Sequence, residues 1–104
     1  MKHKKIDFSA AAKCLKTIAH PHRLSLIYYL ISHKKASVGE LADYCSLPSN
    51  IVSEHLTLMK DRGFLSSVRD GRKTLYSIKE RGLENILSCV KCKFTKKIKT
   101  LKKT

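Results

Sequence analysis

The first third of the chain alternates apolar and polar residues with the period of an α-helix. Apolar side chains between residues 7 and 19 recur at steps of three and four, which predicts an amphipathic helix capped by Asp7 or Ser9. They are Phe8, Ala11, Leu15 and Ile18. Pro21 ends this helix and opens a second one, because proline is tolerated in a first helical turn. The second helix ends in the polar stretch 32–35, and its apolar face comprises Leu24, Ile27, Leu30 and Ile31.

Two further helices with a short break between them are expected next. Ser37 and Glu40 have the spacing of a capping box, in which each side chain bonds to the other residue's backbone N–H. The third helix turns Leu41, Ala42 and Cys45 inward, and a break follows at residues 46–48. The fourth helix buries Val52, Leu56 and Met59, and Gly63 suits its left-handed end. This layout is typical of a helix-turn-helix.

After residue 63 the pattern changes to the period of a β-strand. Residues 64–69 and 73–78 are expected to be strands, and Asp70-Gly71 between them is a strong hairpin signal. An isolated hairpin is marginally stable, so this one must pack on the helices. The sequence therefore predicts a small two-stranded wing beside the helix-turn-helix.

A last helix is expected after Gly82, with Leu83, Ile86, Leu87 and Val90 on its apolar side. The predicted fold is mostly α, with about five helices and a small β-hairpin: a winged helix-turn-helix. We assign DNA binding and dimerisation to one domain at residues 1–92. Residues 93–104 form a lysine-rich C-terminal tail that is expected to fray.

The charge of the chain limits the kinds of partner. Twenty-two Lys and Arg against eight Asp and Glu give a formal net charge of +14. A partner with regular negative charge, nucleic acid first and an anionic membrane second, turns this self-repulsion into binding. No apolar run is long enough to span a membrane, and none follows the basic N-terminus, so we expect a cytoplasmic protein with reduced thiols and no membrane partner. No constellation of catalytic side chains stands out, so an enzyme is not expected.

Four stretches of the chain carry a family resemblance: LKTIAHPHRL (15–24), SVGELA (37–42), IVSEHLTLMKDRGFL (51–65) and RDGRKTLY (69–76). In sequence and in order they resemble the ArsR–SmtB family of bacterial repressors. The resemblance implies an elongated homodimer, joined by its first and last helices, that binds a palindromic operator and blocks transcription. It also implies release by a small inducer or an oxidant.

Short polar side chains cluster at the start of the fourth helix, opposite its apolar positions. They are Ser49, Asn50, Ser53 and Glu54. Asn pairs bidentately with adenine, and Glu accepts from cytosine, so this end of the helix suits the major groove of double-stranded DNA. The resemblance implies that Ser49, Asn50 and Ser53 touch bases, and that His55 has a structural or phosphate-contacting role. The alternative is a merely solvated helix face.

The predicted hairpin carries a second candidate DNA contact. Arg69, Arg72 and Lys73 flank its tip, where they can reach phosphates or the minor groove. The alternative is an ordinary soluble turn. A basic RNA-binding or ribosome-associated module remains the competing function, but RNA readers stack bases on exposed aromatic side chains. In this sequence the aromatic residues Phe8, Phe64 and Tyr76 are instead predicted to face the core, which does not favour RNA binding.

Neither metal site of the family matches this sequence. Where relatives carry a Cys-x-Cys pair, the residues are Ser37 and Gly39, and the last helix has no histidine for the second site. Cys45 is expected to pack in the core. His20 and His22 flank a proline that bends the chain, so their rings are not expected to converge on a metal.

The other three cysteines are candidates for a sensor site whose chemistry the sequence does not decide. Cys89 and Cys92 lie three apart on one helix face, and Cys14 lies on the helix expected nearby in the dimer. Neighbouring lysines favour the thiolate form. Three interpretations stay open: a redox switch, a three-sulfur site for zinc or another soft metal, or small buried apolar residues. The second-helix cysteine of thiol-sensing relatives corresponds to Tyr28, which weakens the redox interpretation.

Overall fold

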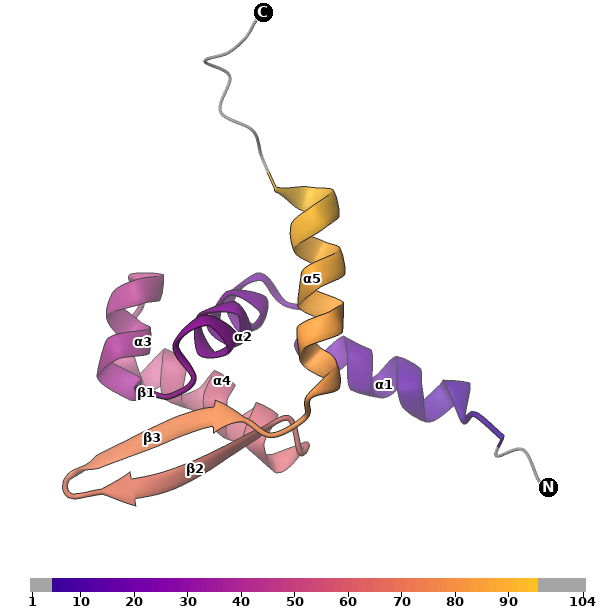
Figure 1. The fold of residues 1–104 in the computed structure, drawn as a ribbon. Helices are drawn as coiled ribbons and strands as arrows, with labels where there is room; N and C mark the ends of the chain where they lie inside the picture. Colours follow the sequence, from indigo (N-terminus) through magenta and orange to yellow (C-terminus); the bar gives the residue numbers. More distant parts are fainter. Residues whose placement is uncertain (1–4, 96–104) are drawn as a thin grey trace, which may run out of the picture.

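The computed structural model describes residues 5–95, and Figure 1 shows its arrangement. Its elements are α1 (Phe8–Ile18), α2 (Pro21–His33), β1 (Ala36–Ser37), α3 (Val38–Cys45), α4 (Ser49–Asp61), β2 (Leu65–Asp70), β3 (Lys73–Ile78) and α5 (Gly82–Phe94). Helices α2, α3 and α4 gather beside a long β2–β3 hairpin, while α1 and α5 extend away from this group. The winged helix-turn-helix class is confirmed.

The two predicted helix starts have the expected caps. Asp7, rather than Ser9, caps α1 by accepting a 3.0 Å hydrogen bond from the Ala10 N–H. At α3 the capping box is complete: the Ser37 N–H donates to Glu40 Oε1 at 2.8 Å, and the Glu40 N–H donates to Ser37 Oγ at 3.2 Å. Hydrogen bonding with the backbone and then the side chain of Ser37 stabilises the ionised carboxylate and holds the pKa of Glu40 below its ordinary value.

The sheet has one strand more than the sequence predicted. Its order is β1–β3–β2 and it is antiparallel throughout, with Ala36 opposite Tyr76 and Ser37 opposite Leu75. A two-residue strand carries no period of its own, so only its partner β3 defines it. β1 joins the wing to the start of α3.

The hairpin turn is shifted by one residue from the prediction. Asp70 pairs with Lys73, so the turn is Gly71-Arg72 and not Asp70-Gly71. Gly71 occupies the left-handed region at φ +66°, which glycine adopts without a steric penalty. Gly63 has the same role after α4, at φ +87°, as the sequence predicted.

The core lies between α2, α3, α4, the sheet and the first turns of α5. Its most completely buried side chains are Leu26, Ile27, Leu30, Leu41, Val52, Leu56, Met59, Leu65 and Leu83. Phe64 and Tyr76 are also buried, as predicted. The prediction for Phe8 was wrong: its side chain is 73% exposed, because the outer part of α1 packs on no other element among residues 5–95.

Helix α5 continues to Phe94, so the predicted boundary at residue 92 falls inside a helix. The predicted fraying of residues 93–104 was wrong for Lys93 and Phe94, which belong to α5, and residues 96–104 lie outside the described residues. Among residues 5–95 no helix is long and apolar enough to cross a membrane.

Candidate nucleic-acid interface

Helix α4 has one buried face and one solvent-exposed face. Val52, Leu56 and Met59 have no solvent exposure and fix the helix on the core. On the other side Ser49, Asn50 and Glu54 are exposed and Ser53 is partly exposed. The predicted DNA-reading side chains thus share an outward face, held by the most buried part of the molecule.

The outward face continues one turn beyond the predicted residues. An open depression of about 360 Å³ is bordered by Ser53, Glu54, Thr57, Leu58 and Asp61. Thr57 is exposed and was not predicted, although its spacing of four residues from Ser53 is the signal that places both on one side of a helix.

The start of α4 offers free backbone donors. The Ile51 and Val52 N–H groups both donate to the Pro48 carbonyl at 3.1 Å, whereas the Ser49 and Asn50 N–H groups precede the helical ladder. In the described part of the chain no side chain caps this end. Unpaired N–H groups and the helix dipole favour a phosphate here.

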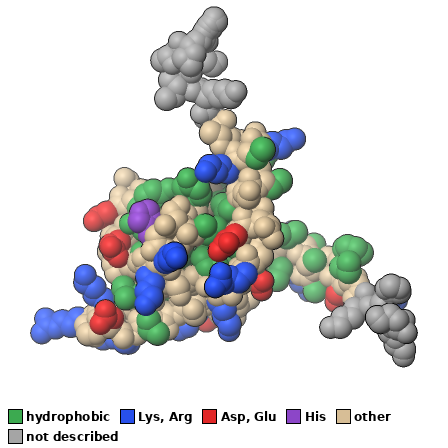
Figure 2. All heavy atoms as spheres, viewed as in Figure 1, with side chains coloured by type: hydrophobic (Ala, Val, Ile, Leu, Met, Phe, Trp, Pro, Cys, Tyr) green, Lys and Arg blue, Asp and Glu red, His purple; other side chains and the backbone are tan. Residues whose placement is uncertain are grey.

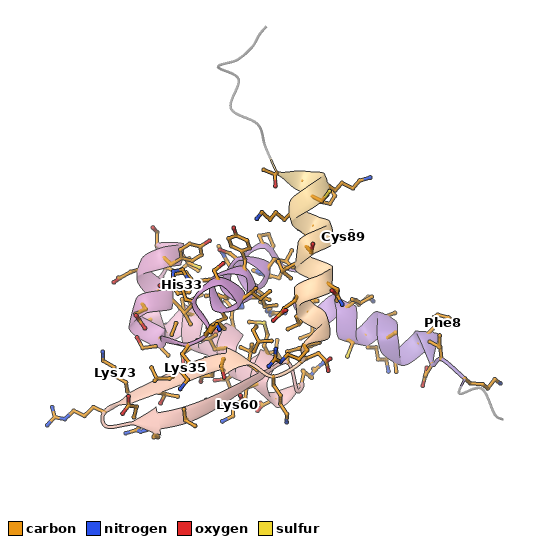
Figure 3. The ribbon with its side chains drawn as sticks, viewed as in Figure 1. Phe8, His33, Lys35, Lys60, Lys73 and Cys89 are labelled. Carbon is orange, nitrogen blue, oxygen red and sulfur yellow. The ribbon has the colours of Figure 1, made fainter. Side chains whose placement is uncertain are left out.

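The hairpin supplies a second exposed basic element. Arg69, Arg72 and Lys73 are all exposed, and Asp70 is the acid among them. Figure 2 shows Lys and Arg side chains at the tip of the hairpin and along its length, and Figure 3 places Lys73 near the tip. The wing therefore projects positive charge beyond the helical body.

Three histidine rings lie close together beside α4, although among residues 5–95 they form no group suited to a metal ion. The ring centroids of His20 and His55 are 4.8 Å apart, and His22 lies 5.3 Å from His20 and 5.8 Å from His55. Pro21 begins α2 at its first turn, so both flanking histidines remain beside α4. His20 caps α2 through its Nδ1, which accepts from the His22 N–H at 3.1 Å.

Arg23 joins this cluster to the end of α1. Its Nε donates to His55 Nδ1 at 3.1 Å, and its Nη1 donates to the Thr17 carbonyl at 2.7 Å. Arg62, just after α4, donates to Thr17 Oγ1 at 3.2 Å. Burial first, and then the charge of Arg23, lower the pKa of His55. The predicted structural role of His55 thus has a geometric basis, namely fixing α4 against α1 and α2.

Comparisons with known proteins fit this geometry. Residues 18–68 match a helix-turn-helix domain family. The chain is 37% identical over 81 residues to the transcriptional regulator YgaV of Escherichia coli, covering 78% of this chain and 82% of YgaV. It is also 37% identical over 76 residues to the transcriptional repressor PagR of Bacillus anthracis, covering 73% of this chain and 76% of PagR. The chain belongs to the ArsR–SmtB family of helix-turn-helix transcriptional repressors.

The fold agrees with that of solved ArsR–SmtB-type regulators. The crystal structure of an E. coli protein described as a predicted DNA-binding transcriptional regulator superposes with a TM-score of 0.76 at 34% identity, covering 84% of this chain and 92% of that one. The chain is thus a DNA-binding regulator of transcription.

The four cysteines of this ArsR–SmtB protein are all free thiols. Cys45 is half-buried on α3, with its Sγ 3.7 Å from Ser25 Oγ, which agrees with core packing. Cys14 on α1 and Cys89 and Cys92 on α5 are exposed (Figure 3 labels Cys89), so within one chain they are not small buried apolar residues. Among residues 5–95 no three His, Cys, Asp or Glu side chains form a group suited to a metal ion.

Proposed function

We propose that two copies of this repressor bind a palindromic DNA operator, with one α4 in each of two successive major grooves. The observation that carries the proposal is the open polar face of α4 on a sealed core, beside a basic wing. Two-fold symmetry requires the two helices to lie about one DNA turn, roughly 34 Å, apart.

The case for a homodimer rests on apolar surface that one chain leaves open. On α1, Phe8 is 73% and Leu15 is 50% exposed. A groove of about 340 Å³ between α2 and α5 is lined largely by apolar side chains, among them Leu24, Tyr28, Leu87, Val90 and Phe94. Exposed apolar surface of this extent marks an interaction site. A second copy that covers both surfaces accounts for them.

Within this complex we assign base reading to Asn50, with Ser49, Ser53 and Glu54 beside it, and phosphate contact to the wing. Asn50 is exposed in the first turn of α4, where a recognition helix approaches base edges. Arg69, Arg72 and Lys73 have the long cationic side chains that neutralise phosphates. RNA binding is not favoured, because Phe64 and Tyr76 beside the wing are buried. The exposed Phe8, Tyr28 and Phe94 belong to the apolar surfaces of α1 and of the α2–α5 groove.

Selection of bound DNA from a random pool tests the proposal directly. The expected product is a palindromic site with half-sites about 10 base pairs apart from centre to centre. Bound DNA without a shared sequence, or a chain that stays monomeric on its DNA, would refute it.

Two variants separate base reading from phosphate contact. Asn50→Ala is expected to relax preference at one operator position, with a loss of about 1–3 kcal/mol on the preferred site only. Arg72→Ala is expected to weaken binding to every sequence and to lower the slope of log affinity against log salt by about one for each phosphate that is no longer neutralised. An equal loss on all sequences for Asn50→Ala contradicts its base-reading role.

We further propose that oxidation of exposed thiols releases the repressor from DNA. Hydrogen peroxide joins two of Cys14, Cys89 and Cys92 in a disulfide, with both thiol protons lost and the peroxide reduced to water. Their exposure supports this over a packing role. Peroxide is expected to weaken operator binding by the wild type but not by a variant with all three changed to Ser. Equal loss in that variant refutes the switch, and release by zinc alone supports the metal alternative.

A further inference from the structure

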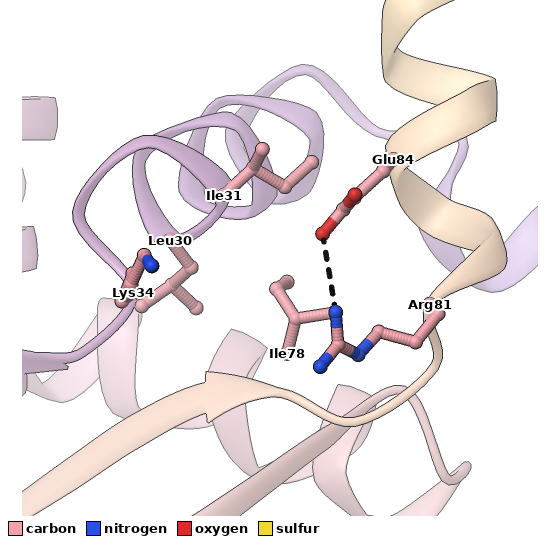
Figure 4. A pocket seen from close by; sticks show the side chains of 6 residues that line it. All are labelled: Leu30, Ile31, Lys34, Ile78, Arg81 and Glu84. Atoms are coloured by element: carbon pink, nitrogen blue, oxygen red, sulfur yellow. Dashed lines mark ion pairs between the residues drawn. The ribbon is translucent and has the colours of Figure 1, made fainter.

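A small pocket lies where the end of α2, the end of β3 and the start of α5 meet (Figure 4). Its volume is about 230 Å³. The residues around it are Leu30, Ile31, Lys34, Ile78, Arg81 and Glu84. Figure 4 shows Lys34 on one side of the space, Arg81 and Glu84 on the other, and Ile78 between them. The pocket thus combines an apolar floor with charged side chains on opposite sides.

Two cations, Lys34 and Arg81, and one acid, Glu84, line the pocket, so its charged residues carry a net positive charge. Arg81 Nη1 lies 3.9 Å from Glu84 Oε2, and these side chains are 85% and 51% exposed. An ion pair this long and this exposed contributes little. A guanidinium prefers a close, two-point contact with a carboxylate. A ligand carboxylate in the pocket can supply that contact to Arg81, with Lys34 as a second cation.

Lys34 has an unusual backbone conformation. Its φ is +69° and its ψ is −47°, and the Lys35 N–H donates to the His33 carbonyl at 2.7 Å across it. This is a tight γ-turn with positive φ, a conformation that is rare and strained for a residue with a side chain. Such strain is concentrated at binding sites, because the surrounding structure must maintain it.

The size of the pocket limits the ligand. Sites for drug-sized ligands have volumes of roughly 300–1,000 Å³, so this space suits a smaller molecule. We propose that the pocket binds a small organic monocarboxylate with a compact apolar body, such as an aromatic acid. The body packs on Leu30, Ile31 and Ile78, and the carboxylate lies between Lys34 and Arg81.

Benzoate is the probe for a titration of the full chain, followed by ¹H–¹⁵N NMR in the absence of DNA. We expect saturable shifts at Ile31, Lys34, Ile78 and Arg81. Benzyl alcohol, with the same ring but no charge, is expected to bind at least tenfold more weakly. Arg81→Ala is expected to weaken benzoate binding at least tenfold, and Lys60→Ala, which removes an exposed cation from α4, to leave it unchanged. Equal binding of the alcohol, an unchanged affinity in Arg81→Ala, or shifts only elsewhere would overturn the site.

The position of the pocket adds a regulatory consequence, which rests on the proposed function. A ligand there bridges α2, the last residue of the wing and the start of α5, and so links the DNA-contacting and dimer-forming parts. Saturating benzoate is therefore expected to change operator affinity several-fold in the wild type and not in Arg81→Ala. Unchanged affinity with benzoate bound refutes this coupling alone, whereas failure to bind any operator without benzoate refutes the proposed function.

Discussion

Two regions of the molecule differ in how much of their apolar surface is buried within one chain. The complete region is the helix-turn-helix with its sheet, and the incomplete region is the pair of flanking helices α1 and α5. In the first region the inner side chains of α2, α3 and α4 are fully buried. In the second, α1 buries only Thr17 and Ile18, next to the core, while Phe8 and Leu15 face solvent. α5 buries Leu83 and Leu87 but leaves Phe94 exposed.

This difference matches the two roles in the proposed complex, namely base reading by one region and assembly of two copies by the other. Recognition of bases requires α4 to be held rigidly, and the sealed core supplies that within one chain. In the proposed complex a symmetric operator requires two such helices at a fixed spacing, and we assign the open apolar sides of α1 and α5 to that assembly. The two regions should therefore respond differently to the same kind of change.

The largest effect is expected in the complete region. Leu56→Ala removes a fully buried side chain from the inner face of α4 and leaves a cavity, so it should lower the free energy of unfolding by about 2–5 kcal/mol. Urea unfolding at one protein concentration measures this. Val68→Ala on the wing is the control: its side chain is 57% exposed, and a surface substitution should cost less than about 0.5 kcal/mol.

In the incomplete region, shortening a leucine side chain should weaken the proposed dimer rather than unfold the chain. Leu15 is 50% exposed, so covering its remaining surface in a dimer contributes about 1 kcal/mol per copy, or about 2 kcal/mol per dimer. Leu15→Ala should then raise the dimer dissociation constant about 30-fold, as measured by analytical ultracentrifugation. Lys16→Ala, next to it and exposed, should have no such effect. If Leu15→Ala instead unfolds the chain as severely as Leu56→Ala, the two regions do not differ as described.

The same contrast explains how much the sequence predicts. Helix starts and inward faces follow from local chemistry, so the capping box at Ser37 and the buried side of α4 were predicted correctly. In α1 the apolar spacing was right for Ile18, which is buried, and wrong for Phe8 and Leu15, which are exposed. Spacing identifies one side of a helix but does not reveal whether anything packs against that side.

Features made by residues far apart in the chain were missed for a different reason. β1 exists only because Ala36 and Ser37 pair with β3, almost forty residues later. His55 meets His20 and Arg23 across more than thirty residues, and neither its spacing nor its local pattern signals that contact. For the candidate DNA-binding residues, the sequence correctly placed the polar cluster of α4 and the basic hairpin residues on the surface. Thr57, which is also exposed, was not among them because the polar cluster is confined to the first turns of α4.

A smaller effect on the free energy of unfolding is expected at the start of α3, where Ser37 both caps the helix and pairs with β3. Ser37→Ala removes the side-chain acceptor of the Glu40 N–H, and the loss of an N-cap costs about 1 kcal/mol. Urea unfolding is the measurement, and Ser88→Ala on the exposed side of α5 is the control. Because Ser37 also belongs to β1, a loss near zero would show that the sheet, and not the cap, holds the start of α3.

The smallest effect is the response of the α1–α2–α4 junction to pH. Burial, then Arg23, then His20 and His22 lower the pKa of His55 below 6.5, and only Glu54 opposes them. The folded state therefore binds the His55 proton less readily than the unfolded state does. This contribution to stability is complete above about pH 6.5 and is lost as pH falls below it. Protonation also removes the lone pair at Nδ1 that accepts from Arg23 Nε.

The measurement is urea unfolding between pH 7.5 and pH 5 for the wild type and two variants. His55→Asn retains an acceptor near Nδ1 but does not titrate, so its stability should fall less with acid than that of the wild type. His33→Asn, at an exposed histidine near the end of α2, should keep the wild-type dependence. If His55→Asn and the wild type lose stability in parallel, the junction of α4 with α1 and α2 does not respond to His55. The acid sensitivity would then arise elsewhere in the chain.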